Sequence, residues 1–158
     1  MKKIIIYILL VLWLILIFFF SHQPAVDSDK VSNKVIDKII HTVEIISGHE
    51  YNDNELEIIS NYLVFPVRKL AHFTLYFILG ILVYNTIRLY SINNKEIWFI
   101  SILFCIIYAC SDEIHQLFIP GRSGELQDVL IDALGSLLGA LIVSKIINRK
   151  QKNLNDKV

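Results

Sequence analysis

The chain has 158 residues, the length of one domain, and leaves little room for a second folded module. Hydrophobic residues make up 54% of it, above the roughly 45–50% that is usual for soluble domains, and they are concentrated in a few long runs. Fifteen basic and fifteen acidic residues cancel, so the charge balance argues against a nucleic-acid partner.

Four of these runs predict an all-α membrane protein with four transmembrane helices. They cover residues 4–20, 70–90, 97–119 and 129–147, and each approaches the roughly 20 residues that cross a ~30 Å hydrocarbon core. The first run follows Met1-Lys2-Lys3, as a signal peptide would. Because its seventeen residues exceed the roughly 7–15 of a signal core and no Ala-x-Ala-like site follows, we expect a retained span.

The distribution of lysine and arginine predicts the orientation of the spans. Four spans place both termini on one side of the membrane, together with nine of the basic residues, against six on the other side. We therefore expect both termini in the cytoplasm. Thirteen of the fifteen acidic residues and all five histidines fall on the outer side, so the reactive side chains gather there.

The first outer loop, residues 21–69, is polar but patterned. Apolar residues recur every three or four positions in its first part: Val31, Val35, Ile39, Val43 and Ile46. This spacing predicts a short amphipathic helix, with Ser28 as N-cap and Gly48 as terminator. A second short helix is expected from Asn52 or Asp53 to the residue before Pro66. Both helices are expected to cover the outer ends of the spans or to lie in the membrane interface, with recognition of an outer partner as the alternative.

Three clusters of polar residues are expected at one depth near the outer ends of the spans. In chain order they are Arg68, Lys69, His72 and Tyr76; Asp112, Glu113, His115 and Gln116; and Arg122, Asp128 and Asp132. Helical spacing places Lys69, His72 and Tyr76 on one face of the second span. Between the last two clusters, Pro120 and Gly121 suit the central positions of a type II turn.

Asp128 and Asp132 continue into a stripe with Gly135 and Gly139 along the fourth span. Small residues in this pattern let two helices approach closely, so we expect the stripe to face the bundle and to carry both carboxylates inward. The same glycines can also mediate an oligomer.

Inserting an ionisable group at the centre of a membrane helix costs roughly 2.5–3.5 kcal/mol of free energy on insertion scales. Such groups are therefore expected either to pair with one another or to serve a function. In a purely structural account, Arg68, Lys69 and Arg122 neutralise the carboxylates. In a binding account, Arg122 near a helix N-terminus holds an anionic head group or another envelope ligand.

Two chemical accounts compete with these. In a catalytic account, His72 or His115 beside Asp112 or Asp132 acts as a general base oriented by a carboxylate. In a metal account, the histidines and carboxylates are acceptable ligands, but their order matches no specific spacing. The sequence therefore assigns no metal and no cofactor.

These stretches resemble the VanZ-like family of bacterial membrane proteins. The matching residues are Arg68-Lys69-x-x-His72-Phe73-x-x-Tyr76-x-x-x-Gly80, Ser111-Asp112-Glu113-Ile114-His115-Gln116-x-Phe118-x-Pro120-Gly121-Arg122, Ser123-Gly124, Asp128, Asp132 and Gly135, with Ser21-x-Gln23 after the first span. His22 departs from the pattern, because the family often has serine there. The resemblance implies a four-span protein that lowers susceptibility to teicoplanin, a lipid-bearing glycopeptide that acts at the outer membrane face. It implies no known reaction.

The sequence thus predicts a single VanZ-like membrane domain over residues 1–148 and a disordered cytoplasmic tail over residues 149–158. We expect a multi-pass protein of the bacterial cytoplasmic membrane. Its outer polar site would bind a lipid head group, a cell-wall precursor or a lipoglycopeptide, in contact with the bilayer. The alternative is a membrane enzyme that acts on a lipid-linked or acyl substrate, with or without a metal.

Overall fold

The protein is built almost entirely of α-helices. The structure, a computed structural model, describes residues 2–90 and 93–156. Its helices are α1 (Lys2–Ser21), α2 (Ala25–Ser47), α3 (Asp53–Ile87), α4 (Asn94–Gln116) and α5 (Leu126–Asn155). The helical fraction is 85%, and the described residues form no strand, which confirms the predicted all-α class.

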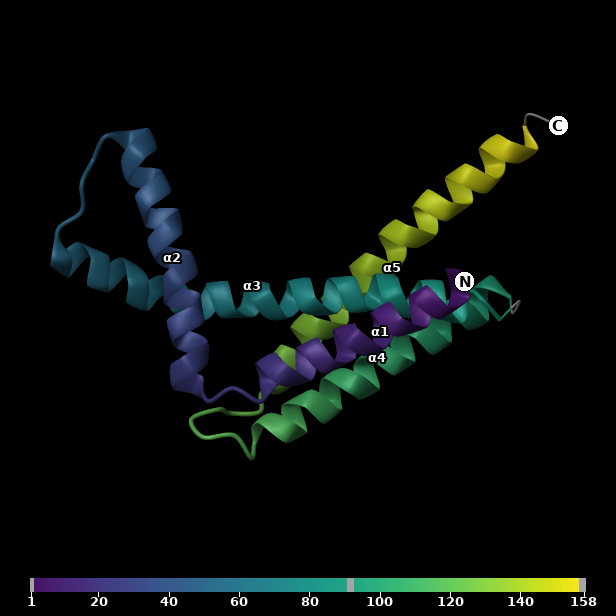
Figure 1. The fold of residues 1–158 in the computed structure, drawn as a ribbon, viewed down its shortest axis with the longest axis horizontal. Coiled ribbons are helices and arrows are strands. Elements are labelled where there is room, and N and C mark those ends of the chain that lie inside the picture. Colours follow the sequence, from purple (N-terminus) through teal and green to yellow (C-terminus); the bar gives the residue numbers. More distant parts are fainter. Residues whose placement is uncertain (1, 91–92, 157–158) are drawn as a thin grey trace.

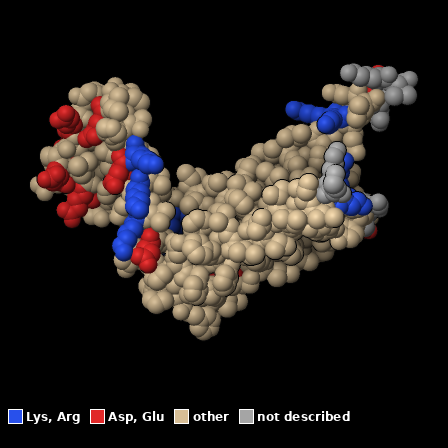
Figure 2. Space-filling model, in the orientation of Figure 1, with Lys and Arg blue, Asp and Glu red and all other residues tan. Residues whose placement is uncertain are grey.

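Four of the five helices, α1, α3, α4 and α5, are long and apolar enough to cross a membrane, as the sequence predicted. In Figure 1, α1, α3 and α4 run along one another, α2 crosses α3 near one end, and the C-terminal half of α5 leans away. Figure 2 shows charged residues gathered over α2 and the adjoining start of α3, and again near the two termini, with mainly uncharged surface between them. The molecule therefore has an apolar band with two charged ends.

The ends of α2 show which local signals decided its length. Gly48 ends the helix in the left-handed conformation, φ 68°, as predicted, and its N–H donates to the Glu44 carbonyl oxygen at 2.8 Å. The predicted N-cap, Ser28, was wrong, because the helix already begins after Pro24. The proline ring holds φ at −53°, and the Pro24 carbonyl oxygen accepts the first helical hydrogen bonds from the N–H groups that follow.

The expected second outer helix and the second span are one continuous helix, α3, so the prediction of two separate helices was wrong. Asn52 starts it with a capping box, in which its side chain accepts from the Glu55 N–H and the Glu55 side chain accepts from the Asn52 N–H. Pro66 lies inside the helix. Proline removes one backbone hydrogen bond and kinks a helix without necessarily ending it, and α3 bends in Figure 1 before its long straight part.

The structure also differs from the sequence prediction at the C-terminal end. α5 continues without a break to Asn155, so residues 149–155, predicted to be disordered, are helical. The segment after Ile147 contains arginine, lysine and glutamine, which are good helix formers, and it contains no glycine or proline to stop the helix. Val158, the end of the predicted tail, lies outside the described residues.

The predicted apolar stripe of α2 is exposed rather than buried. Its five residues, Val31 to Ile46, are 41–81% exposed, and α2 instead turns Ser32, Ile36 and Ile40 toward the protein, where they are buried. Its main helical contact is with α3. The exposed stripe leaves α2 suited to the membrane interface, one of the two places expected for it.

The two helices in closest contact are α3 and α5. Glycines on both sides of this contact leave no room for a side chain: a Cβ on Gly80 would overlap the backbone of Ser136, and a Cβ on Gly139 would overlap the Phe77 carbonyl oxygen. Gly135 lies against the Phe73 backbone in the same way. The glycine stripe therefore faces the bundle, as predicted, and α3 already occupies the surface that an oligomer would have needed.

We predict that Gly139→Ala destabilises the protein by about 1–3 kcal/mol, the usual result of adding a methyl group to a filled contact. The new Cβ has to push α5 away from the Phe77 backbone. The measurement is the thermal midpoint of the detergent-solubilised protein. Leu138→Ala is the control, because Leu138 is 43% exposed and its loss should change the midpoint much less. Equal effects of the two changes would contradict the close contact.

Candidate functional site

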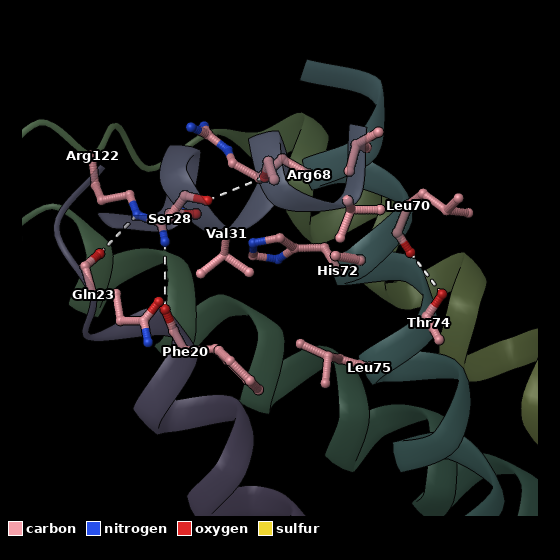
Figure 3. A pocket seen from close by; sticks show the side chains of 14 residues that line it. Phe20, Gln23, Ser28, Val31, Arg68, Leu70, His72, Thr74, Leu75 and Arg122 are labelled. Atoms are coloured by element: carbon pink, nitrogen blue, oxygen red, sulfur yellow. Dashed lines mark hydrogen bonds between the residues drawn. The ribbon is translucent and has the colours of Figure 1, made fainter. Parts of the chain in front are cut away.

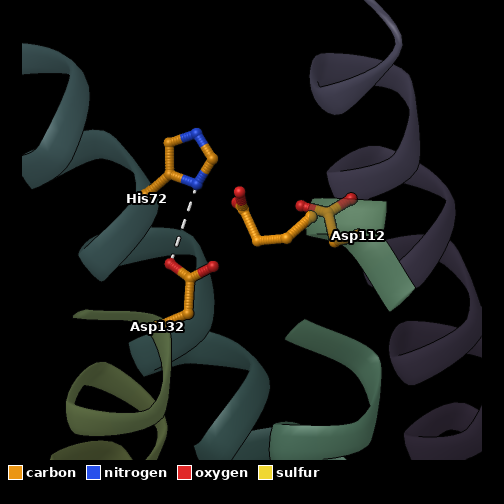
Figure 4. Close-up of side chains that lie close together, drawn as sticks. His72, Asp112 and Asp132 are labelled. Atoms are coloured by element: carbon orange, nitrogen blue, oxygen red, sulfur yellow. Dashed lines mark ion pairs between the residues drawn. The ribbon is translucent and has the colours of Figure 1, made fainter. Parts of the chain in front are cut away.

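Four ionisable side chains from three helices meet near the middle of α3, the end of α4 and the start of α5. We call them the buried cluster: His72 on α3, Asp112 and Glu113 on α4, and Asp132 on α5. One nitrogen or oxygen atom from each lies within 4.8 Å of the corresponding atom of every other member. The three carboxylates are at most 5% exposed. Figure 4 shows His72 and Asp132 facing each other, with Asp112 on the opposite side.

The carboxylates of the buried cluster differ in how many hydrogen bonds they accept. The Gln116 amide nitrogen donates to both carboxylates of α4, at 3.2 Å to Glu113 Oε1 and 3.4 Å to Asp112 Oδ2. The backbone N–H of Glu125 donates to Glu113 Oε2 at 2.9 Å. Asp132 receives no hydrogen bond from the described residues, and its contact with His72 Nδ1 is an ion pair at 3.7 Å.

A second polar contact lies about one helical turn away, toward the N-terminal ends of α3 and α5. Lys69 of α3 forms a buried ion pair with Asp128 of α5 and reaches Glu125 at 3.4 Å. Both members of the Lys69–Asp128 pair are less than 10% exposed. This pair is the part of the predicted neutralisation of carboxylates by basic residues that the structure contains.

The other two basic residues of the predicted site do not neutralise the buried cluster. Arg68 pairs with Asp29 at 3.4 Å. Arg122 donates to the backbone carbonyl oxygens of Gln23 at 3.1 Å and of Phe20 at 3.4 Å, and forms no salt bridge with the described part of the chain. Burial lowers the pKa of the Arg122 guanidinium, and the positive charge of Arg68 lowers it further. Asp29, the salt-bridge partner of Arg68, partly offsets this effect but forms no salt bridge with Arg122.

A tight turn places Arg122 at this position. The Arg122 N–H donates to the Ile119 carbonyl oxygen at 3.1 Å, and Gly121 has φ 73°, so the predicted type II turn is confirmed. The Pro120 carbonyl oxygen accepts a hydrogen bond from the Ala25 N–H at 3.2 Å. The loop between α4 and α5 is thus attached to the start of α2.

A cavity of about 430 Å³ lies between the end of α1, α2 and α3 (Figure 3). Arg68 and Arg122 lie toward one end of it, Phe20 and Leu75 toward the other, and the His72 ring lies between them. Most of the remaining lining is apolar, and part of it, such as Leu70 at 64%, is exposed. The cavity is therefore open and amphipathic, and His72 separates it from the rest of the buried cluster.

The structure places His115 apart from this arrangement. The His115 Nε2 atom lies 3.2 Å from His22 Nδ1, the two rings stack at 5.3 Å, and Phe18 lies 4.8 Å from the His115 ring. The contact joins the ends of α1 and α4. The sequence grouped His115 with Asp112 by helical spacing, but the ring turns toward α1.

Other predicted site residues lie in the interior. Tyr76 is fully buried in the apolar core, next to Leu79, Val83 and Cys105. Gln116 is 2% exposed and holds two carboxylates, as described above. The site also contains residues that the sequence did not assign to it: Ser21, Gln23, Asp29 and Glu125. Ser21 and Gln23 matched the family pattern, and Glu125 lay within the third cluster without being chosen as a candidate ligand, whereas Asp29 had no signal that distinguished it from other surface acids.

A comparison with family models matches residues 5–148 to VanZ/LLP1. The chain belongs to the VanZ/LLP1 family. Comparisons with curated proteins and with solved structures give no match. The VanZ/LLP1 match covers every residue of the buried cluster and of the cavity, and it confirms the resemblance found in the sequence. Membership and the four apolar helices together describe a VanZ/LLP1 membrane protein.

We predict that Lys69→Met destabilises this VanZ/LLP1 protein by about 3–5 kcal/mol, because it leaves the Asp128 carboxylate buried and uncompensated. Adding Asp128→Asn removes the uncompensated charge and should restore much of the loss. The measurement is the thermal midpoint in detergent, with Lys38→Met on the exposed face of α2 as control. A double variant no more stable than Lys69→Met alone would contradict this account.

Proposed function

We propose that this VanZ/LLP1 protein binds an anionic amphiphile of the cell envelope in the outer cavity and thereby lowers susceptibility to lipoglycopeptides such as teicoplanin. The observation that carries the proposal is the amphipathic cavity, with two guanidinium groups toward one end and apolar side chains toward the other. In this proposal both termini lie in the cytoplasm, and the cavity faces the outer leaflet of the bacterial cytoplasmic membrane.

The size and lining of the cavity fit such a ligand. Ligand pockets commonly measure about 300–1,000 Å³ and combine mostly apolar walls with a few placed polar groups. This cavity, at about 430 Å³, has Phe20, Val31 and Leu75 for an acyl or other apolar chain. Exposed lining residues such as Leu70 leave it open at the level where a lipid would approach.

The charges favour an anionic head group. Arg122 is half buried, donates to carbonyl oxygens and has no carboxylate partner among the described residues, while the nearby Arg68 raises the positive potential. Guanidinium groups bind phosphate or carboxylate oxygens through paired, charge-assisted hydrogen bonds. A phosphate or carboxylate there would add a second anion beside Asp29 and would accept hydrogen bonds from Arg122 in place of backbone carbonyl oxygens.

The arrangement of charged surfaces supports the orientation. The end near the termini carries Lys145, Arg149, Lys150 and Lys152 on α5, and Figure 2 shows basic residues gathered there. At the opposite end, acidic residues gather over α2 and the start of α3, beside the lysines of α2. Cytoplasmic ends of membrane proteins are rich in lysine and arginine, so the basic residues near the termini support a cytoplasmic location for them in this proposal.

One observation favours a second function, a membrane enzyme acting on a lipid-linked or acyl substrate. His72 lines the cavity and lies 3.7 Å from the Asp132 carboxylate, an arrangement in which a carboxylate can orient a histidine base. An enzyme of this kind should lose nearly all activity in His72→Gln. A binding protein should lose affinity in graded steps, which separates the two functions.

We predict that Arg68→Gln and Arg122→Gln each weaken binding of spin-labelled phosphatidylglycerol by about tenfold, the loss expected when a charge-assisted hydrogen bond of about 1.5–3 kcal/mol is removed. The measurement uses purified protein in detergent, with spin-labelled phosphatidylcholine for comparison. Lys34→Gln removes an exposed positive charge of α2 outside the cavity and should leave binding unchanged. Equal binding of the two lipids, or equal effects of all three variants, would contradict an anion site.

We predict that expression of the protein in a teicoplanin-sensitive bacterium protects it against teicoplanin more than against vancomycin, which carries no lipid chain. Arg122→Gln and Leu75→Trp should reduce this protection at matched membrane levels, because one removes a cation and the other fills the cavity. Lys34→Gln is again the control. Absence of protection by the correctly inserted wild type would refute the resistance role and leave the lipid-binding measurement to stand alone.

We predict that, in a variant without Cys105 and Cys110, Ser123→Cys reacts with a membrane-impermeant maleimide in intact cells and Lys150→Cys reacts only after the cells are opened. Both positions are exposed, and they lie near opposite ends of α5. Labelling in the reverse pattern would mean that the cavity faces the cytoplasm.

A further inference from the structure

The buried cluster has the composition and spacing of a metal site. It offers one imidazole and three carboxylates from α3, α4 and α5, with donor atoms within 4.8 Å of one another. Ligands about 2.0–2.2 Å from a tetrahedral metal lie roughly 3.4 Å apart, so the longest separation of 4.8 Å would have to shorten by about 1.4 Å for all four residues to bind one ion. Three separate helices supply the ligands, and none of the three carboxylates is more than 5% exposed.

Asp132 is the observation that points to a ligand. It is fully buried, and neither of its carboxylate oxygens accepts a hydrogen bond from the described residues. The same holds for His72 Nδ1, which faces Asp132 at 3.7 Å. A buried carboxylate without a donor is costly, and such a group in a native protein indicates an ion or a water that satisfies it.

The basic side chains near the buried cluster bind other partners. Lys69 is paired with Asp128, Arg68 with Asp29, and Arg122 with backbone carbonyl oxygens. The three carboxylates of the buried cluster therefore face one histidine and no lysine or arginine within ion-pair distance in the described part of the chain. A doubly charged cation would compensate most of this charge.

We propose that His72, Asp112, Glu113 and Asp132 bind a divalent metal ion. The mixture of one imidazole nitrogen with carboxylate oxygens suits Zn²⁺, Mn²⁺ or Fe²⁺, whereas Mg²⁺ and Ca²⁺ prefer oxygen ligands alone.

The surroundings hold the ligands in place, as the outer groups around metal sites do. Gln116 donates to both Asp112 and Glu113, and the Glu125 N–H fixes the second oxygen of Glu113. Each carboxylate oxygen has two lone pairs, so an oxygen that accepts one hydrogen bond can still bind the ion. Because the glycine contact fixes α5 against α3, His72 and Asp132 are held facing each other, with Asp112 of α4 on the opposite side of the site.

The site adjoins the cavity through His72, which belongs to both. A metal there would supply a Lewis acid beside whatever polar group the cavity holds. The metal proposal does not depend on the proposed resistance function, since it rests on the buried cluster alone.

The test is metal binding by the purified full-length protein. After treatment with a chelator, the protein is incubated separately with Zn²⁺, Mn²⁺, Fe²⁺ under anaerobic conditions and Mg²⁺. Bound metal is then counted by elemental analysis after gel filtration. We expect a single ion of one of the first three metals per chain and a rise in the thermal midpoint on binding. Stoichiometric binding of none of these three metals would refute the proposal.

Asp132→Asn and His72→Gln should weaken binding by more than about tenfold. Asp132→Asn removes a buried charge and is not expected to unfold the protein, so its metal-free thermal midpoint should equal or exceed that of the metal-free wild type. The exposed Asp37→Asn is the matched control.

His22→Gln distinguishes the second place where histidines meet. If this change abolishes metal binding while Asp132→Asn does not, the ion binds the exposed His22–His115 pair and the proposal is wrong. The wild type loaded with Co²⁺ gives a further check that needs no variant. Its visible spectrum should show nitrogen and oxygen ligands, and the appearance of a thiolate charge-transfer band from Cys105 or Cys110 would overturn the ligand set.

Discussion

The close contact between α3 and α5 is the constraint on which the site depends. The helices run in the same direction, since Lys69 meets Asp128 at one end of the contact and Tyr84 meets Ser144, through a hydrogen bond of 3.1 Å, toward the other end. Between these contacts glycines bring one backbone against the other. A shift of α5 by one helical turn would bring side chains into the space of the glycines, so this register is the one in which Asp132 faces His72.

The polar groups are thereby sorted into two environments. Lys69 and Asp128 form a complete buried ion pair that joins two helices and needs nothing further. One turn further along the same two helices, His72 and Asp132 lie 3.7 Å apart, and neither His72 Nδ1 nor the Asp132 carboxylate has a hydrogen-bond partner among the described residues. Because both sets lie between the same two helices and only one turn apart, the difference between them does not come from the helix packing. It reflects where the cations are, and it concentrates the chemical interest on the buried cluster.

Much of the fold follows from local sequence patterns. The apolar runs gave the spans, Gly48 the end of α2, Pro120 and Gly121 the turn, and the Gly135 stripe the inward face of α5. Signals of this kind act over a few residues and can be read one segment at a time. Pro66, however, was wrongly taken as the end of a helix. A helix can continue through a proline when the turns on each side are intact and only one hydrogen bond is lost.

The partners within the site could be predicted only in part. Helical spacing correctly placed Lys69, His72 and Tyr76 on one inward face, but it could not say that Arg68 would pair with Asp29 on α2. Nor could it show that the His115 ring would turn toward His22 on α1. These choices depend on the angle and distance between whole helices, which no single segment contains. For the same reason the cavity, formed by three separate helices, had no signature in the sequence.

The position of Asp128 and Asp132 on α5 has a consequence for biosynthesis. α5 is the last of the five helices to leave the ribosome, so Lys69 and His72 are made well before the carboxylates that face them. Until α5 docks, the surface of α3 around Gly80 is uncovered and Lys69 lacks its counter-ion. Assembly of the site and completion of the bundle are therefore one event, and its timing is set by the insertion of the final helix.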